Sequence, residues 1–203
     1  MGRTLRRNGS TAGKVLWHVT MSLDGFIAGP GDVMDRILRY SGPHEASAMR
    51  AITDEVVSTT GAVLVGRRSY DTGRRNGQRA EFSTVYGGAW TGPQFVLTHR
   101  APDVPEDPTI TFLSGDIHRA VTTALRAAKG KNVVVIGANV AQQCIHARLV
   151  DEILVRLAPV LLGEGVRLYG GPWTLPIDLE TASITRSGQL TNLRFRVVRS
   201  PST

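Results

Sequence analysis

Cysteine is almost missing from this chain of 203 residues, which contains only Cys144. One cysteine excludes an internal disulfide and a cysteine-based zinc site, and it fits a reducing compartment. The five histidines are spread along the chain, and no two of them stand at the spacing of paired metal ligands. The sequence therefore predicts no metal site and, for Cys144, the role of a small core residue.

Long apolar runs are missing as well, because no stretch approaches the length of a membrane span. Residues 1–13 are basic and rich in small polar side chains, and they are not followed by the apolar segment of a secretory signal. The remaining length and a hydrophobic content of 41% suit one globular domain. We therefore predict a flexible basic tail over residues 1–13, a single domain over residues 14–203, a cytoplasmic location and no membrane partner.

Three common catalytic and nucleotide-binding fingerprints are also absent. The sequence has no G-x-G-x-x-G run after its first predicted strand, no phosphate-binding P-loop and no G-x-S-x-G elbow. These absences disfavour a dehydrogenase of the usual dinucleotide-binding fold, a nucleoside triphosphatase and a serine hydrolase of the elbow type.

Acidic residues are scarce relative to basic ones: 17 carboxylates face 24 lysines and arginines, for a net charge of +7. Nucleic-acid binding is one explanation of such a charge. The arginines are scattered, however, and neither an aromatic platform nor a recognition helix accompanies them. We favour the arginine usage of a GC-rich bacterial genome together with a pocket for an anionic cofactor, and we predict no nucleic-acid partner.

Strand-like and helix-like segments alternate along the chain. Strands are predicted over residues 14–20, 62–65, 95–98, 109–113, 132–136 and 153–157. Helices are predicted over residues 43–60, 116–129 and 140–148, and a long loop over residues 72–92. The chain ends in two antiparallel strands, over residues 179–186 and 193–198. This order predicts an α/β three-layer sandwich around a mostly parallel sheet, with an antiparallel hairpin at the C-terminus.

The predicted strands end in polar or glycine-rich turns. These turns are Gly66-Arg67-Arg68-Ser69, Thr98-His99-Arg100, Ser114-Gly115 and Gly137-Ala138-Asn139. Ligands of open α/β sheets bind beyond the carboxyl ends of the strands, and a glycine turn that opens a helix is a natural anion site. Each turn alone could be a plain surface turn, but the ordered set predicts a site for a dinucleotide with an extra ribose phosphate, held by arginine.

Five segments together resemble a known family. They are residues 21–29 (MSLDGFIAG), 65–70 (VGRRSY), 96–100 (VLTHR), 135–139 (VIGAN) and 149–165 (LVDEILVRLAPVLLGEG). In this order they resemble the dihydrofolate-reductase-like superfamily over about residues 14–198. The chain looks closest to stand-alone relatives of the reductase domain of the bifunctional riboflavin-biosynthesis deaminase/reductase.

The resemblance implies an NADPH-binding site. It assigns phosphate contacts to Gly66, Arg67 and Ser69, and it places Arg68 and Ser114 among the other cofactor-binding residues. It assigns the adenine-side ribose and its 2′-phosphate to Thr98, His99 and Arg100. It assigns the pyrophosphate to Gly137, Ala138, Asn139, Val140 and Ala141 at the start of a helix. It assigns the nicotinamide to Thr20, Ile27 and Ala28, with residues 24–32 as a lid.

The function implied is that of an NADPH-dependent oxidoreductase that transfers a hydride to a small pterin- or pyrimidine-like heterocycle, and the protein is expected to be a homodimer. The alternative is a non-catalytic NADPH- or flavin-binding protein. Asp24 is the candidate catalytic group near the reacting centre, or else a residue that caps its own turn. Trp90 is the candidate for stacking on a flat substrate, or else an anchor of the long loop in the core.

The sequence departs from the family pattern at two positions. Ala138 adds a Cβ where the family often has glycine beside the pyrophosphate, which would loosen cofactor binding or alter its pose. Phe26 replaces a lysine that often follows Ser-Leu-Asp-Gly in riboflavin reductases, which puts their phosphorylated substrate in question. The carboxylates Asp54 and Glu55 lie in the stretch where dihydrofolate reductases carry an acid, but solvated helical acids are the favoured interpretation.

Overall fold

The structure is a computed structural model that describes residues 13–41, 47–75, 85–102, 107–171 and 176–199. The predicted basic tail, apart from Gly13, lies outside these residues. The strands are β1 (Val15–Ser22), β2 (Phe26–Ala28), β3 (Thr60–Gly66), β4 (Gln94–Leu97), β5 (Ile110–Leu113), β6 (Asn132–Ile136), β7 (Glu152–Ala158), β8 (Val166–Arg167), β9 (Leu179–Ser187) and β10 (Leu190–Val197). The helices are α1 (Asp35–Leu38), α2 (Ser47–Thr59), α3 (Arg67–Arg75), α5 (Ile117–Ala127) and α6 (Ala138–His146), with short 3-10 helices η1 (Pro30–Asp32), η2 (Arg39–Ser41) and η3 (Val85–Gly88).

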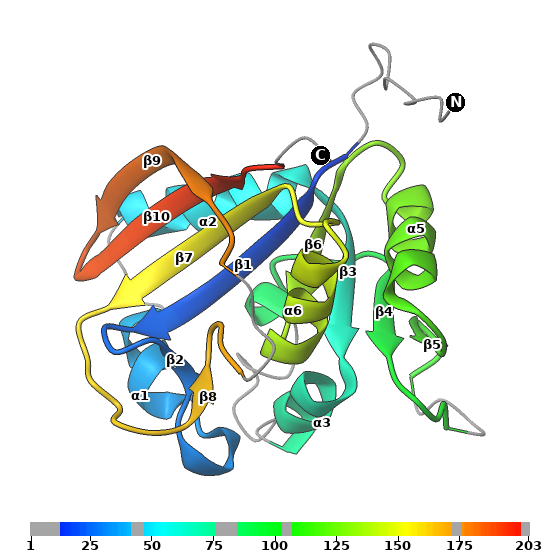
Figure 1. Ribbon diagram of the computed structural model, residues 1–203, viewed down its shortest axis with the longest axis horizontal. Helices are drawn as coiled ribbons and strands as arrows, with labels where there is room; N and C mark the ends of the chain where they lie inside the picture. The colour runs from blue at the N-terminus through cyan, green and yellow to red at the C-terminus, as the bar shows by residue number, and fades with distance from the viewer. Residues whose placement is uncertain (1–12, 42–46, 76–84, 103–106, 172–175, 200–203) are drawn as a thin grey trace.

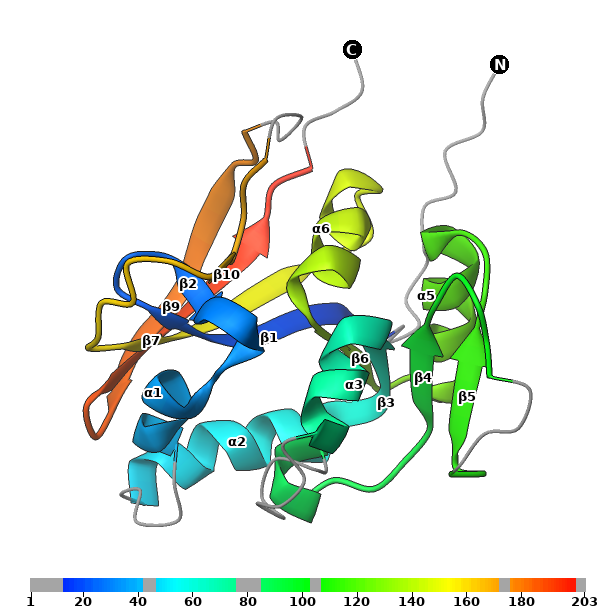
Figure 2. The ribbon, with the colours of Figure 1, turned by 90° about the horizontal axis from the view of Figure 1, so that it is seen from below.

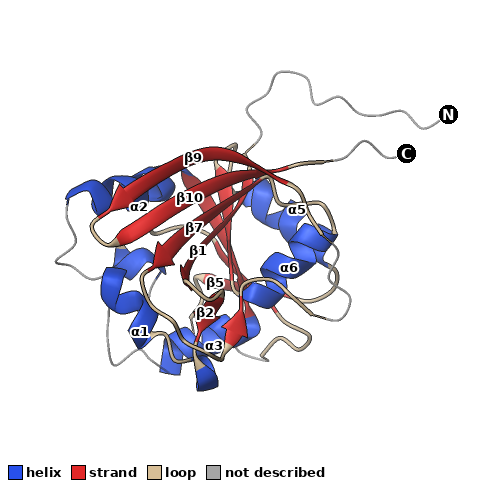
Figure 3. Ribbon diagram, turned by 60° about the vertical axis from the view of Figure 1, so that its left-hand side comes forward, coloured by secondary structure: helices blue, strands red, loops and turns tan. Residues whose placement is uncertain are grey.

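Eight strands form one sheet in the order β5-β4-β3-β6-β1-β7-β10-β9. The strands from β5 to β7 run parallel, whereas β10 is antiparallel to both β7 and β9. The hairpin of β9 and β10 closes one edge of the sheet (Figure 3). The predicted α/β architecture, with its mostly parallel sheet and C-terminal antiparallel hairpin, is confirmed.

Helices cover both faces of the sheet. Figure 2 shows α5 and α6 on one side and α2 on the other. Alternate residues of β1 serve the two faces, since Val15 and Trp17 belong to the core under α5 and α6, while Leu16 packs in the core that includes Val56 of α2. Burying each of these large apolar side chains stabilises the fold by about 1.5–3 kcal/mol. The period-two pattern of the strand therefore fixes which side chains reach which layer.

Helix α5 shows how local sequence sets an element. Asp116 precedes the helix, and its carboxylate accepts a hydrogen bond from the backbone N–H of Arg119 at 2.9 Å. Such a cap contributes about 1 kcal/mol. Ile117, Val121 and Ala124 are then buried on the face toward the sheet. The predicted helix over residues 116–129 is thus present as Ile117–Ala127, with its apolar stripe turned to the sheet.

The segment predicted as a long loop over residues 72–92 is partly helical, and this prediction is corrected. Helix α3 runs to Arg75, and η3 follows at Val85–Gly88; residues 76–84 lie outside the described part. The sequence pattern did not predict α3 because that helix has almost no apolar stripe. Its helical turns are supported by an Arg67–Asp71 ion pair at 2.9 Å, and by Tyr70 packed edge-on against Phe112.

Two short strands also escape the sequence pattern. Strands β2 and β8 pair with each other and stand apart from the main sheet, next to the end of β1 (Figure 1). Together they bring residues 26–28 and 166–167, far apart in the sequence, to the same side of the cleft described below. Within the described part of the chain, no helix is long and apolar enough to cross a membrane.

Candidate active site

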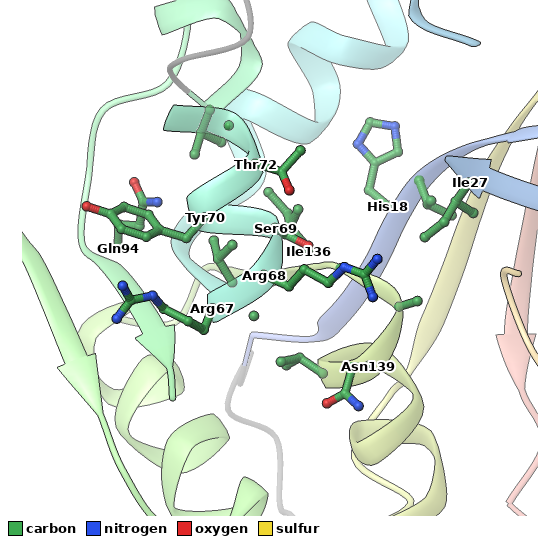
Figure 4. A pocket seen from close by; sticks show the side chains of 18 of the residues that line it. His18, Ile27, Arg67, Arg68, Ser69, Tyr70, Thr72, Gln94, Ile136 and Asn139 are labelled. Atoms are coloured by element: carbon green, nitrogen blue, oxygen red, sulfur yellow. The ribbon is translucent and has the colours of Figure 1, made fainter. Parts of the chain in front are cut away.

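A cleft of about 2370 Å³ opens at the carboxyl ends of the parallel strands. Its walls come from the ends of β1, β3, β4 and β6, from the helices α3 and α6 that follow two of these strands, and from β2 (Figure 4). Arginines outnumber carboxylates among the described lining residues. Because a typical small-molecule pocket has about 300–1,000 Å³, this cleft has room for an anionic dinucleotide together with a second small molecule.

Two glycine turns meet at the centre of the cleft. Gly66 is the last residue of β3 and Gly137 comes directly after β6, and each is followed at once by a nine-residue helix. A Cβ on Gly137 would lie 2.4 Å from Ser69 Oγ, and a Cβ on Gly66 would lie 3.0 Å from Val140 Cγ2. Gly137 also has φ of +100°, which disfavours any side chain. The turns approach so closely that the N-termini of α3 and α6 converge on one place.

Converging helix N-termini fit a pyrophosphate. Each N-terminus offers unpaired backbone N–H groups and a positive dipole end, which together favour an anion. We call this anion site, formed where the turns at Gly66 and Gly137 meet, the glycine cradle. It exists only because neither glycine carries a side chain. Ala138 stands one position inside α6, next to this cradle, and is itself only partly buried.

The two arginines at the start of α3 are both held by aspartates. The Arg67 Nε donates to both Asp71 carboxylate oxygens at 2.9 Å, and Arg68 pairs with Asp32 through two contacts of 2.7 Å. The second pair joins α3 to the predicted lid, because Asp32 belongs to the 24–32 segment. The hydrogen bond and charge of Asp32 raise the pKa of Arg68. A phosphate that bound Arg68 would therefore have to displace the Asp32 carboxylate.

The end of β4 provides an exposed basic turn. The Thr98 hydroxyl donates to the carbonyl of Arg100 at 3.0 Å and accepts from its N–H at 3.3 Å, which fixes the turn. His99 and Arg100 project from it with exposed side chains on the cleft wall. Because an exposed guanidinium binds phosphate bidentately, this turn has the chemistry for a second phosphate away from the cradle.

The structure brings most of the predicted cofactor residues together. Those on the cleft wall are Thr20, Ile27, Ala28, Gly66, Arg67, Arg68, Ser69, Thr98, His99, Arg100, Gly137, Ala138, Asn139 and Val140. Ser114 and Ala141 are not on this wall. Ala141 is a fully buried residue of α6, and Gly115 lines the cleft in place of its neighbour Ser114.

Asp24, the predicted catalytic residue, is not among the residues that line the cleft, and its carboxylate binds a neighbouring turn instead. It accepts hydrogen bonds from the Ser22 hydroxyl at 2.6 Å, and from the backbone N–H groups of Leu162 and Gly163 at 3.0 and 2.6 Å. The Ser22 bond is the main cause that lowers the pKa of Asp24 to about 2, with the two backbone bonds adding to it. We propose that Asp24 clamps two loops together.

Replacing Asp24 with asparagine tests this clamp. The folded-state pKa lies below the usual 3.8, so the carboxylate stabilises the fold above that value and loses its contribution as the pH falls toward about 2. The asparagine variant is expected to unfold at lower urea concentration at neutral pH and to show a shallower loss of stability between these pH values. Urea titrations over this range measure both effects. Equal urea midpoints for the two proteins at neutral pH would contradict the clamp.

Trp90 anchors the end of its loop in the hydrophobic core. Its side chain is buried in the α2-side core, and its indole Nε1 donates to the Thr60 carbonyl at 3.2 Å. Part of the ring reaches the cleft wall. The predicted stacking on a substrate is thus disfavoured, because the indole N–H and most of the ring are already engaged in the core.

Three polar residues that the sequence did not predict as site residues line one end of the cleft. His18 on β1, Arg156 on β7 and Tyr86 on η3 all line it, and Arg156 pairs in register with Thr20 of β1. Arg156 and the His18 Nε2 are buried. One signal was available: His18 and Thr20 are two residues apart on a strand, and therefore share a face. No pattern in the sequence indicates that Tyr86 joins them.

Comparison with known proteins agrees with this geometry. The family described as RibD C-terminal domain matches residues 13–193. The uncharacterized protein YwjB of Bacillus subtilis (strain 168) is 25% identical over 157 residues, which is 77% of this chain and 82% of that protein.

Solved structures share the fold. A putative riboflavin biosynthesis protein from Shewanella sp. PV-4 matches with a TM-score of 0.74 at 20% identity, over 92% of this chain and 99% of that one. The riboflavin biosynthesis reductase Rib7 of Saccharomyces cerevisiae matches at 0.59 and 14%, over 95% and 93%. Dihydrofolate reductase from Enterococcus faecalis, complexed with NADP(H), matches at 0.56 and 15%, over 92% and 97%.

These structures bear out the dihydrofolate-reductase-like fold, and the family match covers nearly all of the described sheet. The chain belongs to the RibD C-terminal domain family.

Proposed function

We propose that this protein is an NADPH-dependent reductase that transfers a hydride to a small pyrimidine- or pterin-like heterocycle. The observation that carries the proposal is the glycine cradle, in which Gly66 and Gly137 bring two helix N-termini to one anion site. Family membership and the reductases among the structural neighbours support it. A cytoplasmic location and pairing of two copies stay predictions from the sequence.

The residues of the chain divide the cofactor site into three parts. The cradle would hold the pyrophosphate, His99 and Arg100 would hold the 2′-phosphate, and Thr20, Ile27 and Ala28 would flank the nicotinamide. When bound, NADPH supplies a hydride. The protein's tasks are then to orient the two reactants and to exclude water, and the buried apolar side chains of β2 provide a dry wall for that end of the cleft.

Cofactor titration tests the proposal. Binding of NADPH and of NADH to the purified chain can each be followed through tryptophan fluorescence, and NADPH is expected to bind more tightly. Replacing Arg100 with glutamine should weaken NADPH binding about 10- to 100-fold and leave NADH binding unchanged, because only NADPH has the 2′-phosphate. Arg126 of α5 is exposed and away from the cleft, so Arg126→Gln is the matched control.

Failure to bind either dinucleotide would contradict the proposal. Binding without turnover would favour the non-catalytic alternative. Turnover is to be measured as loss of NADPH with dihydrofolate and with 5-amino-6-(5-phosphoribosylamino)uracil as probe substrates. A clear preference between the two probes would decide between a pterin-like and a pyrimidine-like substrate.

A further inference from the structure

The segment Tyr86-Gly87-Gly88 has an unusual backbone. All three residues are left-handed, with φ of 54°, 62° and 85°. Glycine adopts this conformation freely, but for a bulky aromatic residue it is strained. Strained residues persist where the surrounding structure holds them, and they concentrate at functional sites. Tyr86 in this conformation lines the cleft.

His18 holds Tyr86 there. The His18 Nδ1 lies 2.9 Å from the Tyr86 hydroxyl, and the two rings are stacked with centroids 5.6 Å apart and planes 23° apart. Trp90, anchored in the core, follows the segment closely and fixes its far end. Figure 4 shows His18 rising from β1 on the same wall of the cleft as Ile27 of β2. The pair thus stands beside the residues proposed to flank the nicotinamide.

Both side chains are neutral at physiological pH. Burial, with a smaller effect from the charges of Arg156 and Arg194, lowers the pKa of His18 to about 3. Burial raises the pKa of Tyr86 well above its ordinary value, although the charge of Arg156 opposes this change. A neutral imidazole carries one proton, so either His18 Nδ1–H donates to the Tyr86 oxygen or Nδ1 accepts the Tyr86 O–H.

The other ring nitrogen indicates which arrangement is favoured. His18 Nε2 is buried and has no hydrogen-bond partner among the described residues. If it carried the proton, a buried N–H would be left without an acceptor, which folded proteins rarely tolerate. With the proton on Nδ1, only a lone pair is left unmatched. In that state the Tyr86 oxygen accepts from His18, and its own O–H is free to point into the cleft.

We propose that Tyr86 is the proton donor of the reduction and that His18 positions it. This inference rests on the proposed function. In the proposed step the substrate carbon receives the hydride, the electron pair of its C=N bond moves to nitrogen, and that nitrogen takes the Tyr86 proton as the O–H bond breaks. The substrate is reduced by two electrons while the dinucleotide is oxidised. The phenolate is stabilised by His18 Nδ1–H and Arg156, and regains a proton from water.

The tautomer of His18 tests the arrangement without any substrate. In the full chain with ¹⁵N-labelled histidine, imidazole nitrogen shifts report which nitrogen is protonated, and the signals missing from His18→Gln identify His18. His18 is expected to stay neutral between about pH 5 and 8, where an ordinary histidine titrates, with the proton on Nδ1. A proton on Nε2, or titration of His18 in this range, would overturn the proposal.

Kinetics of Tyr86→Phe test the chemical role, with NADPH and whichever of the two probe substrates is turned over. The ring and its stacking remain, so the Kd for NADPH should stay within about twofold of wild type, while kcat falls about 100-fold or more, as loss of a proton donor predicts. Tyr40→Phe, which removes a hydroxyl outside the cleft, is the control and should keep kcat. Full kcat in Tyr86→Phe would overturn the proposal.

The two proposals fail differently. If the chain does not bind NADPH, the proposed function fails whatever the His18 tautomer. If NADPH binds and is turned over but Tyr86→Phe is unaffected, only the proton donor is wrong. A large loss of kcat in Asp54→Asn combined with an active Tyr86→Phe would assign the proton to that exposed carboxylate of the cleft wall.

Discussion

Replacing Gly137 with alanine is expected to weaken NADPH binding about 100-fold, which corresponds to on the order of 3 kcal/mol. The new Cβ would lie 2.4 Å from Ser69 Oγ and 3.3 Å from Ser69 Cβ, so Ser69 would have to leave its place in the cradle. The φ of +100° adds backbone strain of about 1–3 kcal/mol for a residue with a side chain. The helix N-termini would then no longer converge on the anion.

Two variants make this result specific. Ala138→Gly removes a Cβ one position further on, where no positive φ is required, and it should bind NADPH at least as tightly as wild type. Gly137→Ala combined with Ser69→Gly removes the steric overlap but keeps the backbone strain, so its comparison with Ser69→Gly alone separates the two causes. Fluorescence titration with NADPH measures all of them, and urea unfolding checks that each variant is folded. Wild-type affinity in Gly137→Ala would show that the cradle does not hold the pyrophosphate.

Acidification is expected to destabilise the protein through His18. The pKa of His18 is about 3 in the folded state and 6.5 ordinarily. Between these pH values His18 is therefore protonated in the unfolded chain and neutral in the folded chain. The contribution of His18 to the free energy of unfolding is therefore fully present above about pH 6.5. Below that pH it falls by up to about 1.4 kcal/mol for each pH unit. The loss ends near the folded-state value. Burial of the ring is the main cause, and Arg156 and Arg194 add repulsion.

The difference between wild type and His18→Gln isolates this term from other titrating groups. Urea unfolding at several pH values between about 7 and 4 should give a steeper decline for wild type than for the variant. His118 of α5 is exposed, and His118→Gln should follow the wild-type profile. Parallel profiles for wild type and His18→Gln would mean that His18 is hydrated in the folded state, and the interpretation of the His18–Tyr86 pair would then need revision.

Much of the fold was predictable because its signals are local. Four consecutive β-branched apolar residues such as those at 133–136 in β6 favour a buried strand, and the Asp116 cap with the stripe of α5 favours a helix. Helix α3 was missed because its stability comes from an ion pair and from contact with Phe112 on another strand. Strands β2 and β8 are too short to give a pattern, and they exist because they pair with each other.

The candidate site divides in the same way. The sequence by itself determined which turns end the strands, and hence the glycines and arginines of the cleft wall, since parallel strands bring their carboxyl ends to one edge. It also determined the family, through the order of five motifs. Only the tertiary structure decided that the Asp24 carboxylate accepts from Leu162 and Gly163, that the Trp90 indole is anchored in the core, and that Tyr86 meets His18. These outcomes depend on contacts between residues far apart in the chain, and no local preference encodes a partner that folding alone brings near.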